Sequence, residues 1–241
     1  MANLLVTSYV NASMSANATA IIVFARSASA ECSHKFISTS AYKNRLLFEL
    51  FNNRVRAIVK KTRLPHYTFD ETQQKGLTFA EKITHSIESV FSLGYQNLIV
   101  IGNDCPAMNM SLLKEVIVAV EAGKNVFGPD NRGGVYLMGL QKSSYYTDIF
   151  KNLRWQTSFL FRDIVNMYQV NDVRVLPKLK DVNTRYDALI SISDIRLSET
   201  LRAFLMACLT LFIKIKRIFL LHFSIYDSFQ CRPLRAPPFF G

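Results

Sequence analysis

The chain has 241 residues, of which 49% are hydrophobic and 20% are charged. This length is enough for one domain with a full hydrophobic core, and the composition excludes an intrinsically disordered chain. The net charge of +11 favours an anionic partner, such as a nucleotide, a nucleic acid or an acidic membrane surface. Because neither aromatic-interleaved basic motifs nor zinc-finger spacings occur, we do not expect nucleic acid to be that partner.

The cysteines and the N-terminus indicate a cytoplasmic protein. The four cysteines are far apart and include no CxxC pair, which is typical of reduced thiols rather than of a disulfide framework. Residues 1–18 lack a basic leader region and a cleavage-like pause, so no signal peptide is expected. Cys105 follows Asp104 directly, and a neighbouring carboxylate raises the pKa of a thiol, which makes Cys105 a poor nucleophile.

The first strong strand signal is the apolar run Thr19–Phe24, which predicts a strand covered on both faces. The small, polar residues that follow carry Arg26 and Lys35 near their two ends. Such a segment after a strand can cradle phosphate, although it contains no glycine. An exposed loop without function is the alternative.

Two amphipathic helices follow. Apolar residues at steps of three and four predict a long helix from about Ser40 to Lys61, with a basic and solvated outer face. A short strand is expected at His66–Phe69. Thr78 and Glu81 have the spacing of a capping box, which predicts the start of the next helix.

A central strand is predicted at Asn97–Gly102, where branched apolar residues run up to a glycine. We interpret it as a central parallel strand. Open α/β sheets bind ligands beyond the carboxyl ends of their strands. Asp104 therefore lies where an α/β enzyme would hold a metal ion or a phosphate-bearing substrate.

The next part of the chain alternates further helices and strands. A helix is expected over Ser111–Glu121, and strands are expected over Asn125–Pro129 and Val135–Leu140. Between these strands, Gly133 and Gly134 form either a tight hairpin turn or a place where the backbone approaches a ligand. The whole alternation predicts an α/β fold with three α/β/α layers and a mostly parallel central sheet.

Two more segments complete this domain. Trp155 and Thr157 precede a helix, and Trp155 either packs as a lid, stacks on a ring or is simply buried. A last short strand is expected at Val173–Pro177, and polar residues including Asp181 and Asn183 follow it.

The C-terminal part, residues 197–241, differs in character from the domain expected over residues 1–196. Ala203–Ile213 contains no charge, but eleven residues cannot cross a bilayer core about 30 Å thick. Lys214, Lys216 and Arg217 follow at once. We expect a helix packed on the domain or on a partner; peripheral contact with an anionic membrane is the alternative. The end of the chain is rich in proline.

Four short motifs occur in order along residues 19–187. They are Ile-Gly-Asn-Asp104-Cys-Pro, Gly128-Pro129 with Gly133-Gly134-Val-Tyr-Leu-Met-Gly139, Trp155-Gln-Thr157, and Asp181-Val-Asn183-Thr184. In this order and spacing, the chain resembles a family of largely uncharacterised bacterial glycosyltransferase-like proteins. Members of that family have the GT-A or nucleotide-diphospho-sugar transferase fold and often carry an arsenosugar-biosynthesis label.

The resemblance implies a metal-dependent transferase with a nucleotide-activated donor, most simply a nucleotide-sugar, and a small acceptor. Asp104, helped by Asn183, would bind Mg²⁺ or Mn²⁺, a hard cation that shares its oxygen ligands with phosphates. Arg26 and Lys35 would bind the phosphates. The resemblance further implies that Gly133, Gly134, Trp155 and Thr157 contact substrate, and no catalytic base is identified.

The chain also departs from the family. Arg132 stands where an Asp usually precedes the glycine pair, and Asn183 stands where a second Asp is frequent. Arg132 reverses a charge near the expected site, while Asp130 is close enough in sequence to compensate. A catalytically impaired nucleotide-binding protein, and a nucleotidyltransferase, therefore stay open as alternatives.

Overall fold

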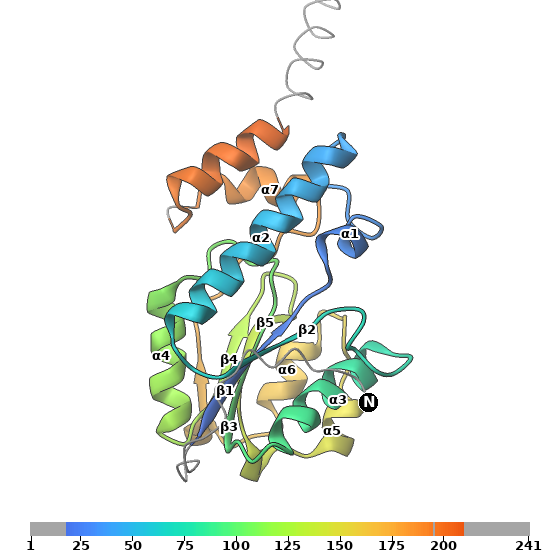
Figure 1. Cartoon of the computed structure of the whole chain (residues 1–241). Helices are drawn as coiled ribbons and strands as arrows, with labels where there is room; N and C mark the ends of the chain where they lie inside the picture. Colours follow the sequence, from blue (N-terminus) through green and yellow to red (C-terminus); the bar gives the residue numbers. More distant parts are fainter. Residues whose placement is uncertain (1–17, 195, 210–241) are drawn as a thin grey trace, which may run out of the picture.

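The computed structural model describes residues 18–194 and 196–209. It contains one six-stranded sheet, in the order β2-β1-β3-β5-β4-β6 (Figure 1). The strands are β1 (Thr19–Phe24), β2 (His66–Phe69), β3 (Asn97–Ile101), β4 (Asn125–Pro129), β5 (Val135–Gln141) and β6 (Val173–Val175).

Helices cover both faces of this sheet. The labelled helices are α1 (Ala28–Glu31), α2 (Ala41–Lys61), α3 (Phe79–Phe91), α4 (Met110–Glu121), α5 (Thr147–Lys151), α6 (Leu160–Val165) and α7 (Arg185–Ser191). Short 3-10 turns occur at Lys142–Ser144 and Val170–Asp172, and residues 199–209 are also helical. The predicted three-layer α/β/α fold is confirmed.

The alternating side chains of β1 show how the two outer layers are held. Ile21 and Val23 point into a buried cluster with α2, α4 and α7, whereas Ala20 and Ile22 join a second cluster with α3, α5 and α6. Because both faces of β1 are buried, an unbroken apolar run is the sequence that suits this strand. Figure 1 shows α4 and α3 on opposite sides of the sheet.

The sheet is mostly parallel, as predicted, but one strand runs against the others. β1 is parallel to β2 and β3, and β4 is parallel to β6, whereas β5 is antiparallel to both of its neighbours, β3 and β4. The prediction that Asn97–Gly102 is a central parallel strand therefore needs correction on one side, because β3 has an antiparallel neighbour. The physical reason is the short connection from β4 to β5, which only a hairpin can close.

The predicted helix starts are confirmed in atomic detail. The Ser40 side chain caps α2, and Thr78 with Glu81 forms the complete capping box of α3. Gly94 and Gly123 have φ values of +102° and +80° just beyond α3 and α4, where glycine is favoured.

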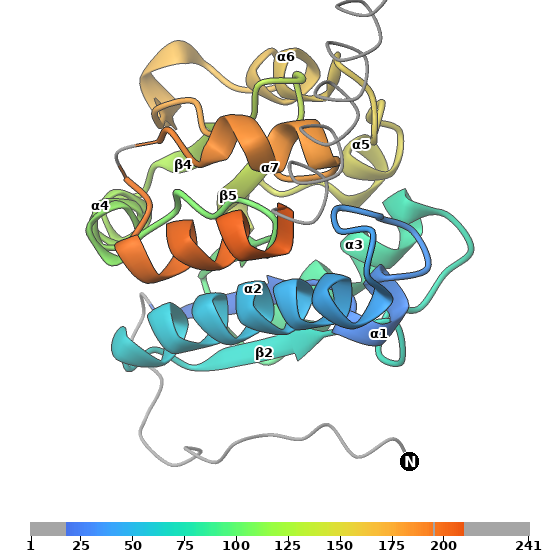
Figure 2. The same ribbon diagram turned by 90° about the horizontal axis from the view of Figure 1, so that it is seen from above.

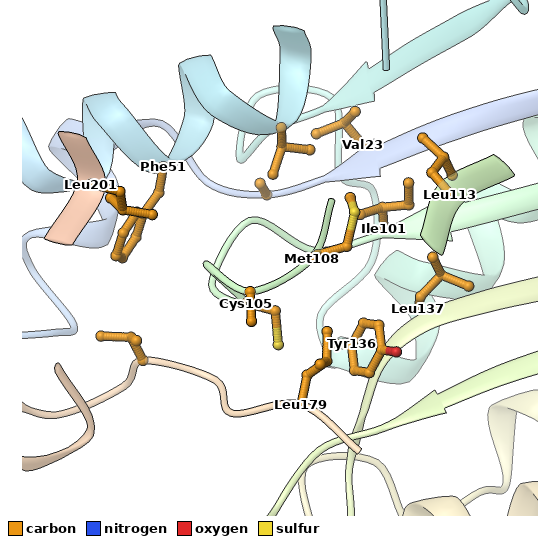
Figure 3. Close-up of a cluster of buried hydrophobic side chains, with 14 of the residues drawn as sticks. Val23, Phe51, Ile101, Cys105, Met108, Leu113, Tyr136, Leu137, Leu179 and Leu201 are labelled. Atoms are coloured by element: carbon orange, nitrogen blue, oxygen red, sulfur yellow. The ribbon is translucent and has the colours of Figure 1, made fainter. Parts of the chain in front are cut away.

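The helical segment 199–209 packs on the domain. Leu201 and Leu205 are buried in the same cluster as Phe51 of α2 (Figure 3). The hydroxyl of Ser38 donates to the carbonyl oxygen of Cys208 at 3.1 Å, which fixes the segment beside α2, as seen from above in Figure 2. The remainder of the expected C-terminal extension, including its proline-rich end, lies outside the described residues. None of the described helices is long and apolar enough to cross a bilayer.

Candidate functional site

A cavity of about 540 Å³ opens at the carboxyl ends of β1 and β3. These strands are parallel neighbours, so the loops that follow them start side by side. Most of the residues singled out in the sequence line this cavity. They are Arg26, Lys35, Asp104, Gly134, Trp155 and Asn183.

Buried amides hold the loops after β1 and β3 together. Asn52, on the inner face of α2, donates to the carbonyl oxygen of Arg26 at 3.1 Å and accepts from the Asn103 side chain at 2.7 Å. The late loop is attached as well, because the backbone N–H of Val182 donates to the carbonyl oxygen of Asp104 at 2.8 Å. Asn183, the next residue, lines the same cavity as Asp104.

The two predicted phosphate-binding cations are already paired with carboxylates. Buried Glu31 accepts Arg26 at 3.3 Å and Lys35 at 2.9 Å, and Lys35 also contacts Asp104 at 3.1 Å. Burial by itself would lower the pKa of Lys35, but the charges of Asp104 and Glu31 outweigh it and raise that pKa. Lys35 is therefore a protonated, positively charged ammonium group at neutral pH.

Sequence reasoning did not assign Glu31 a role. The residue belongs to the short helix α1, in a segment that was expected to be a loop. The one signal in the sequence was its position four residues before Lys35, which is the spacing of a helical ion pair. Phe79 and Lys82 of α3 also line the cavity and were not singled out.

Two carboxylates that line the cavity, Asp104 and Asp130, act electrostatically on a third, Asp181, which does not line it. Burial first, and then the charges of Asp104 and Asp130, raise the pKa of Asp181 to about 6. The side-chain amide of Asn183 donates to Asp181. Among residues 18–194 and 196–209, no group of three or more His, Cys, Asp or Glu side chains is close enough to hold a metal ion by itself.

Arg132 lies at the edge of this acidic cluster and pairs mainly with Asp187. Its guanidinium donates to both carboxylate oxygens of Asp187 at 2.7 Å and lies 4.0 Å from Asp181, and Arg132 does not line the cavity. Asp130 does line it, and its carboxylate accepts the backbone N–H groups of Arg132 and Gly134 at 2.7 and 2.8 Å. The reversed charge is thus largely satisfied by Asp187, and Asp130 presents a carboxylate to the cavity.

Both glycines of the pair lie close to neighbouring atoms, and at Gly133 those atoms are backbone. Gly133 has a φ of +86°, and a Cβ atom there would overlap the carbonyl oxygen of Ser158; Gly133 does not line the cavity. Gly134 does line it, but a Cβ atom there would overlap the carboxylate of Asp130. The pair therefore forms the predicted β4–β5 hairpin turn, and because Gly134 lines the cavity, its contact with a substrate stays a prediction.

Trp155 and Thr157 have different positions. The Trp155 ring lines the cavity, packs 5.5 Å from the Phe79 ring and donates from Nε1 to the carbonyl oxygen of Phe150 at 2.6 Å. Thr157 is exposed, lies outside the cavity lining and donates to the carbonyl oxygen of Arg154 at 2.7 Å. Cys105 is buried, and burial followed by the Asp104 charge raises the pKa of its thiol, as expected.

Comparison with known proteins agrees with this fold. Residues 50–157 match the family described as "Uncharacterized protein conserved in bacteria (DUF2064)". The crystal structure of a "putative nucleotide-diphospho-sugar transferase" from Desulfovibrio desulfuricans G20 is similar, with a TM-score of 0.66 and 20% identity, over 80% of this chain and 97% of that one. The predicted resemblance to a largely uncharacterised bacterial family is confirmed, and the structural likeness shows the shared fold.

More distant structures are also found. Rv0371c from Mycobacterium tuberculosis H37Rv has a TM-score of 0.44 at 10% identity, over 73% of this chain and 98% of that one. Its homolog from Mycobacterium sp. strain JC1 has a TM-score of 0.41 at 12% identity, over 78% and 97%. No curated protein sequence matches the chain significantly.

Proposed function

We propose that this chain, whose residues 50–157 match that bacterial family, is a transferase that uses a nucleotide-activated donor, most simply for sugar transfer to a small acceptor. The observation that carries the proposal is the meeting of Arg26, Lys35 and Asp104 in one cavity at the carboxyl ends of β1 and β3. Ligands of open α/β sheets bind at this edge. The fold shared with the Desulfovibrio protein supports the same class of reaction.

The two ends of the cavity suit the two parts of such a donor. Arg26 and Lys35 provide cationic hydrogen-bond donors for phosphate oxygens. Trp155 and Phe79 provide an aromatic wall that can pack against a sugar or base ring. Gly134 also lines the cavity, whereas Gly133 and Thr157 would act on substrate only through the shape of their loops.

A divalent cation, Mg²⁺ or Mn²⁺, fits the donor set of the site. Asp104 would hold it, with Asn183 and Asp130 supplying further oxygen atoms to the same cavity. Mg²⁺ commonly binds through one or two carboxylates together with substrate phosphates, so a complete protein cage is not required. When bound, such an ion would neutralise the charge that develops on the departing phosphate group.

Two alternatives use the same cavity. A nucleotidyltransferase would release pyrophosphate and would need the same cations around the phosphates. A binding protein without turnover is favoured by one specific observation, namely that Glu31 and Asp104 already neutralise both Arg26 and Lys35.

Thermal denaturation of the full chain against a panel of nucleotide-sugars and nucleoside triphosphates, with and without Mn²⁺, tests the proposal. We expect one donor to raise the melting temperature only with Mn²⁺, and Asp104→Ala to abolish that rise. Asp172→Ala, which removes an exposed carboxylate outside the cavity lining, should leave it unchanged. No rise with any donor would contradict the proposal, and a metal-independent rise without product in mass spectrometry would favour the binding protein.

A further inference from the structure

Lys35 occupies the position from which a cation would contact Asp104. Its ammonium nitrogen lies 3.1 Å from Oδ2 of Asp104 and 2.9 Å from Oε1 of Glu31, and its side chain is only 17% exposed. Glu31 is held in turn by Arg26. Two carboxylates and two cations thus form one neutral chain across the phosphate end of the cavity.

We propose that the Lys35 ammonium is an internal counter-ion that competes with divalent metal for Asp104 in the free protein and moves onto the donor phosphates when metal and donor bind. This inference rests on the proposed function. It assigns Lys35 a second role beyond phosphate binding: the ammonium group neutralises Asp104 and weakens metal binding there until the diphosphate binds.

The metal ion and the Lys35 ammonium group would repel each other if both lay beside Asp104, so one of them has to move. A divalent ion on Asp104 would lie within a few ångströms of the ammonium group, and like charges at that distance in a partly buried site repel strongly. The backbone at Asp104 is held by the neighbouring Asn103–Asn52 hydrogen bond and by the bond from Val182 to its carbonyl oxygen, whereas Lys35 has a long stem with rotatable bonds. Glu31, four residues earlier, can keep hold of Lys35 while its contact with Asp104 breaks.

The phosphates are the natural destination of the ammonium group. Arg26 and Lys35 flank the same carboxylate of Glu31 and line the same cavity, so an arriving diphosphate meets both cations together. For Lys35, the new contacts with phosphate replace its broken ion pair with Asp104. No buried charge is therefore left unpaired. Metal and diphosphate should therefore bind cooperatively.

Lys35→Met is a suitable variant because it keeps the stem and removes only the charge. Glu31 would still be paired with Arg26 at 3.3 Å, and the Asp104 side chain is 30% exposed to the cavity, so no carboxylate becomes buried and uncompensated. Lys60→Met removes the same charge from an exposed position on α2 and serves as the matched control. Melting temperatures would confirm that both variants fold.

The experiment measures Mn²⁺ binding by electron paramagnetic resonance, and binding of inorganic pyrophosphate by calorimetry at saturating Mn²⁺. For Lys35→Met we expect about tenfold tighter binding of Mn²⁺ alone and about tenfold weaker binding of pyrophosphate, the scale of one lost charged contact. Glu31→Gln leaves Asp104 as the carboxylate partner of Lys35, so the variant should bind Mn²⁺ more weakly in the absence of pyrophosphate. Lys60→Met should change neither affinity.

Opposite signs for metal and diphosphate separate this role from a merely structural one. If Lys35→Met weakens the binding of Mn²⁺ alone, or leaves it unchanged, Lys35 is not the competitor and the inference is wrong. Adding Asp104→Ala to Lys35→Met must abolish the gained Mn²⁺ affinity; if the gain persists, the metal binds elsewhere and the inference also fails. If wild type binds no pyrophosphate while Lys35→Met still gains Mn²⁺ affinity, the competition stands and the proposed function falls.

Discussion

Arg132 stands where the resembled family usually has Asp, and its charge is paired with the neighbouring Asp187. The Asp187 carboxylate accepts the backbone N–H of Thr184 at 2.7 Å within the capping box of α7, and it also receives the Arg132 guanidinium. Arg132 thereby lies at the N-terminal end of α7, where Asp187 at 2.7 Å and, at 4.0 Å, Asp181 balance its charge. The departure from the family pattern left an impaired site open as an alternative; the structure shows Arg132 in an ion pair with Asp187, outside the cavity lining.

Asp187→Ala should lower the free energy of unfolding by about 1–2 kcal/mol, the usual cost of losing a helix cap. Burial would raise the pKa of Asp187, but its hydrogen bonds from Thr184 and Asn183 and the charge of Arg132 bring it below the ordinary value. A lowered folded-state pKa contributes stability above the unfolded pKa and loses it as the pH falls. The difference from wild type should therefore shrink as the pH falls below the ordinary aspartate pKa of about 3.9.

Urea denaturation at several pH values would measure this difference. Asp172→Ala, at an exposed carboxylate for which the structure gives no ion pair, is the matched control and should show little loss at any pH. A pH-independent loss for Asp187→Ala would show that the carboxylate charge does not stabilise α7.

Gly133→Ala should destabilise the protein more than Gly123→Ala. Both glycines have a φ between +80° and +86°, so each substitution incurs backbone strain of roughly 1–2 kcal/mol. At Gly123 no heavy atom lies within 4 Å of the new Cβ, whereas at Gly133 the Cβ would overlap the backbone of Ser158. Melting temperatures of the two variants isolate the packing cost, and equal losses would contradict a close contact between the hairpin and the Trp155 loop.

At the scale of elements, the sequence predicts those features that are determined by residues close together along the chain. β1 and β3 are buried on both faces, and capping boxes join residues three apart, so both kinds of feature leave a readable pattern. α1, α5 and α7 have four to seven residues, too few to show a period. The antiparallel direction of β5 and the contact between Lys35 and Asp104, 69 residues apart, follow only from how the elements pair and pack.

Asn52 connects one element to the geometry of the whole site without lining the cavity. Asn52→Ala leaves the buried Asn103 amide and the Arg26 carbonyl without their partner, and we expect a loss of about 1–3 kcal/mol in the free energy of unfolding. The affinity for pyrophosphate with Mn²⁺ should fall too, because the loops that carry Arg26 and Asp104 are no longer joined. Asn53→Ala, at the adjacent exposed position, is the control. Unchanged pyrophosphate affinity in a folded Asn52→Ala protein would show that this bridge does not position the loops.

At the scale of the whole molecule, the residues that contact the end of the segment 199–209 have exposed apolar neighbours in the sequence. Ser38, Lys43 and Arg185 bond to the carbonyl oxygens of residues 208, 207 and 209, respectively. Within two residues of these contacts along the chain, the structure exposes large apolar side chains, namely Phe36, Tyr42, Tyr186 and Met206. The sequence then continues with apolar residues and Lys214, Lys216 and Arg217.

Apolar side chains beside basic residues are what binds an anionic bilayer surface. We therefore predict that the full chain sediments with vesicles containing phosphatidylserine and that this binding weakens as salt increases. Neutralising Lys214, Lys216 and Arg217 with glutamine should abolish sedimentation. Neutralising Arg56, Lys60 and Lys61 on the exposed side of α2 removes the same charge and should have little effect. Equal losses in the two triple variants would mean that the net charge of +11 alone attracts the vesicles, and no sedimentation of wild type would exclude the contact.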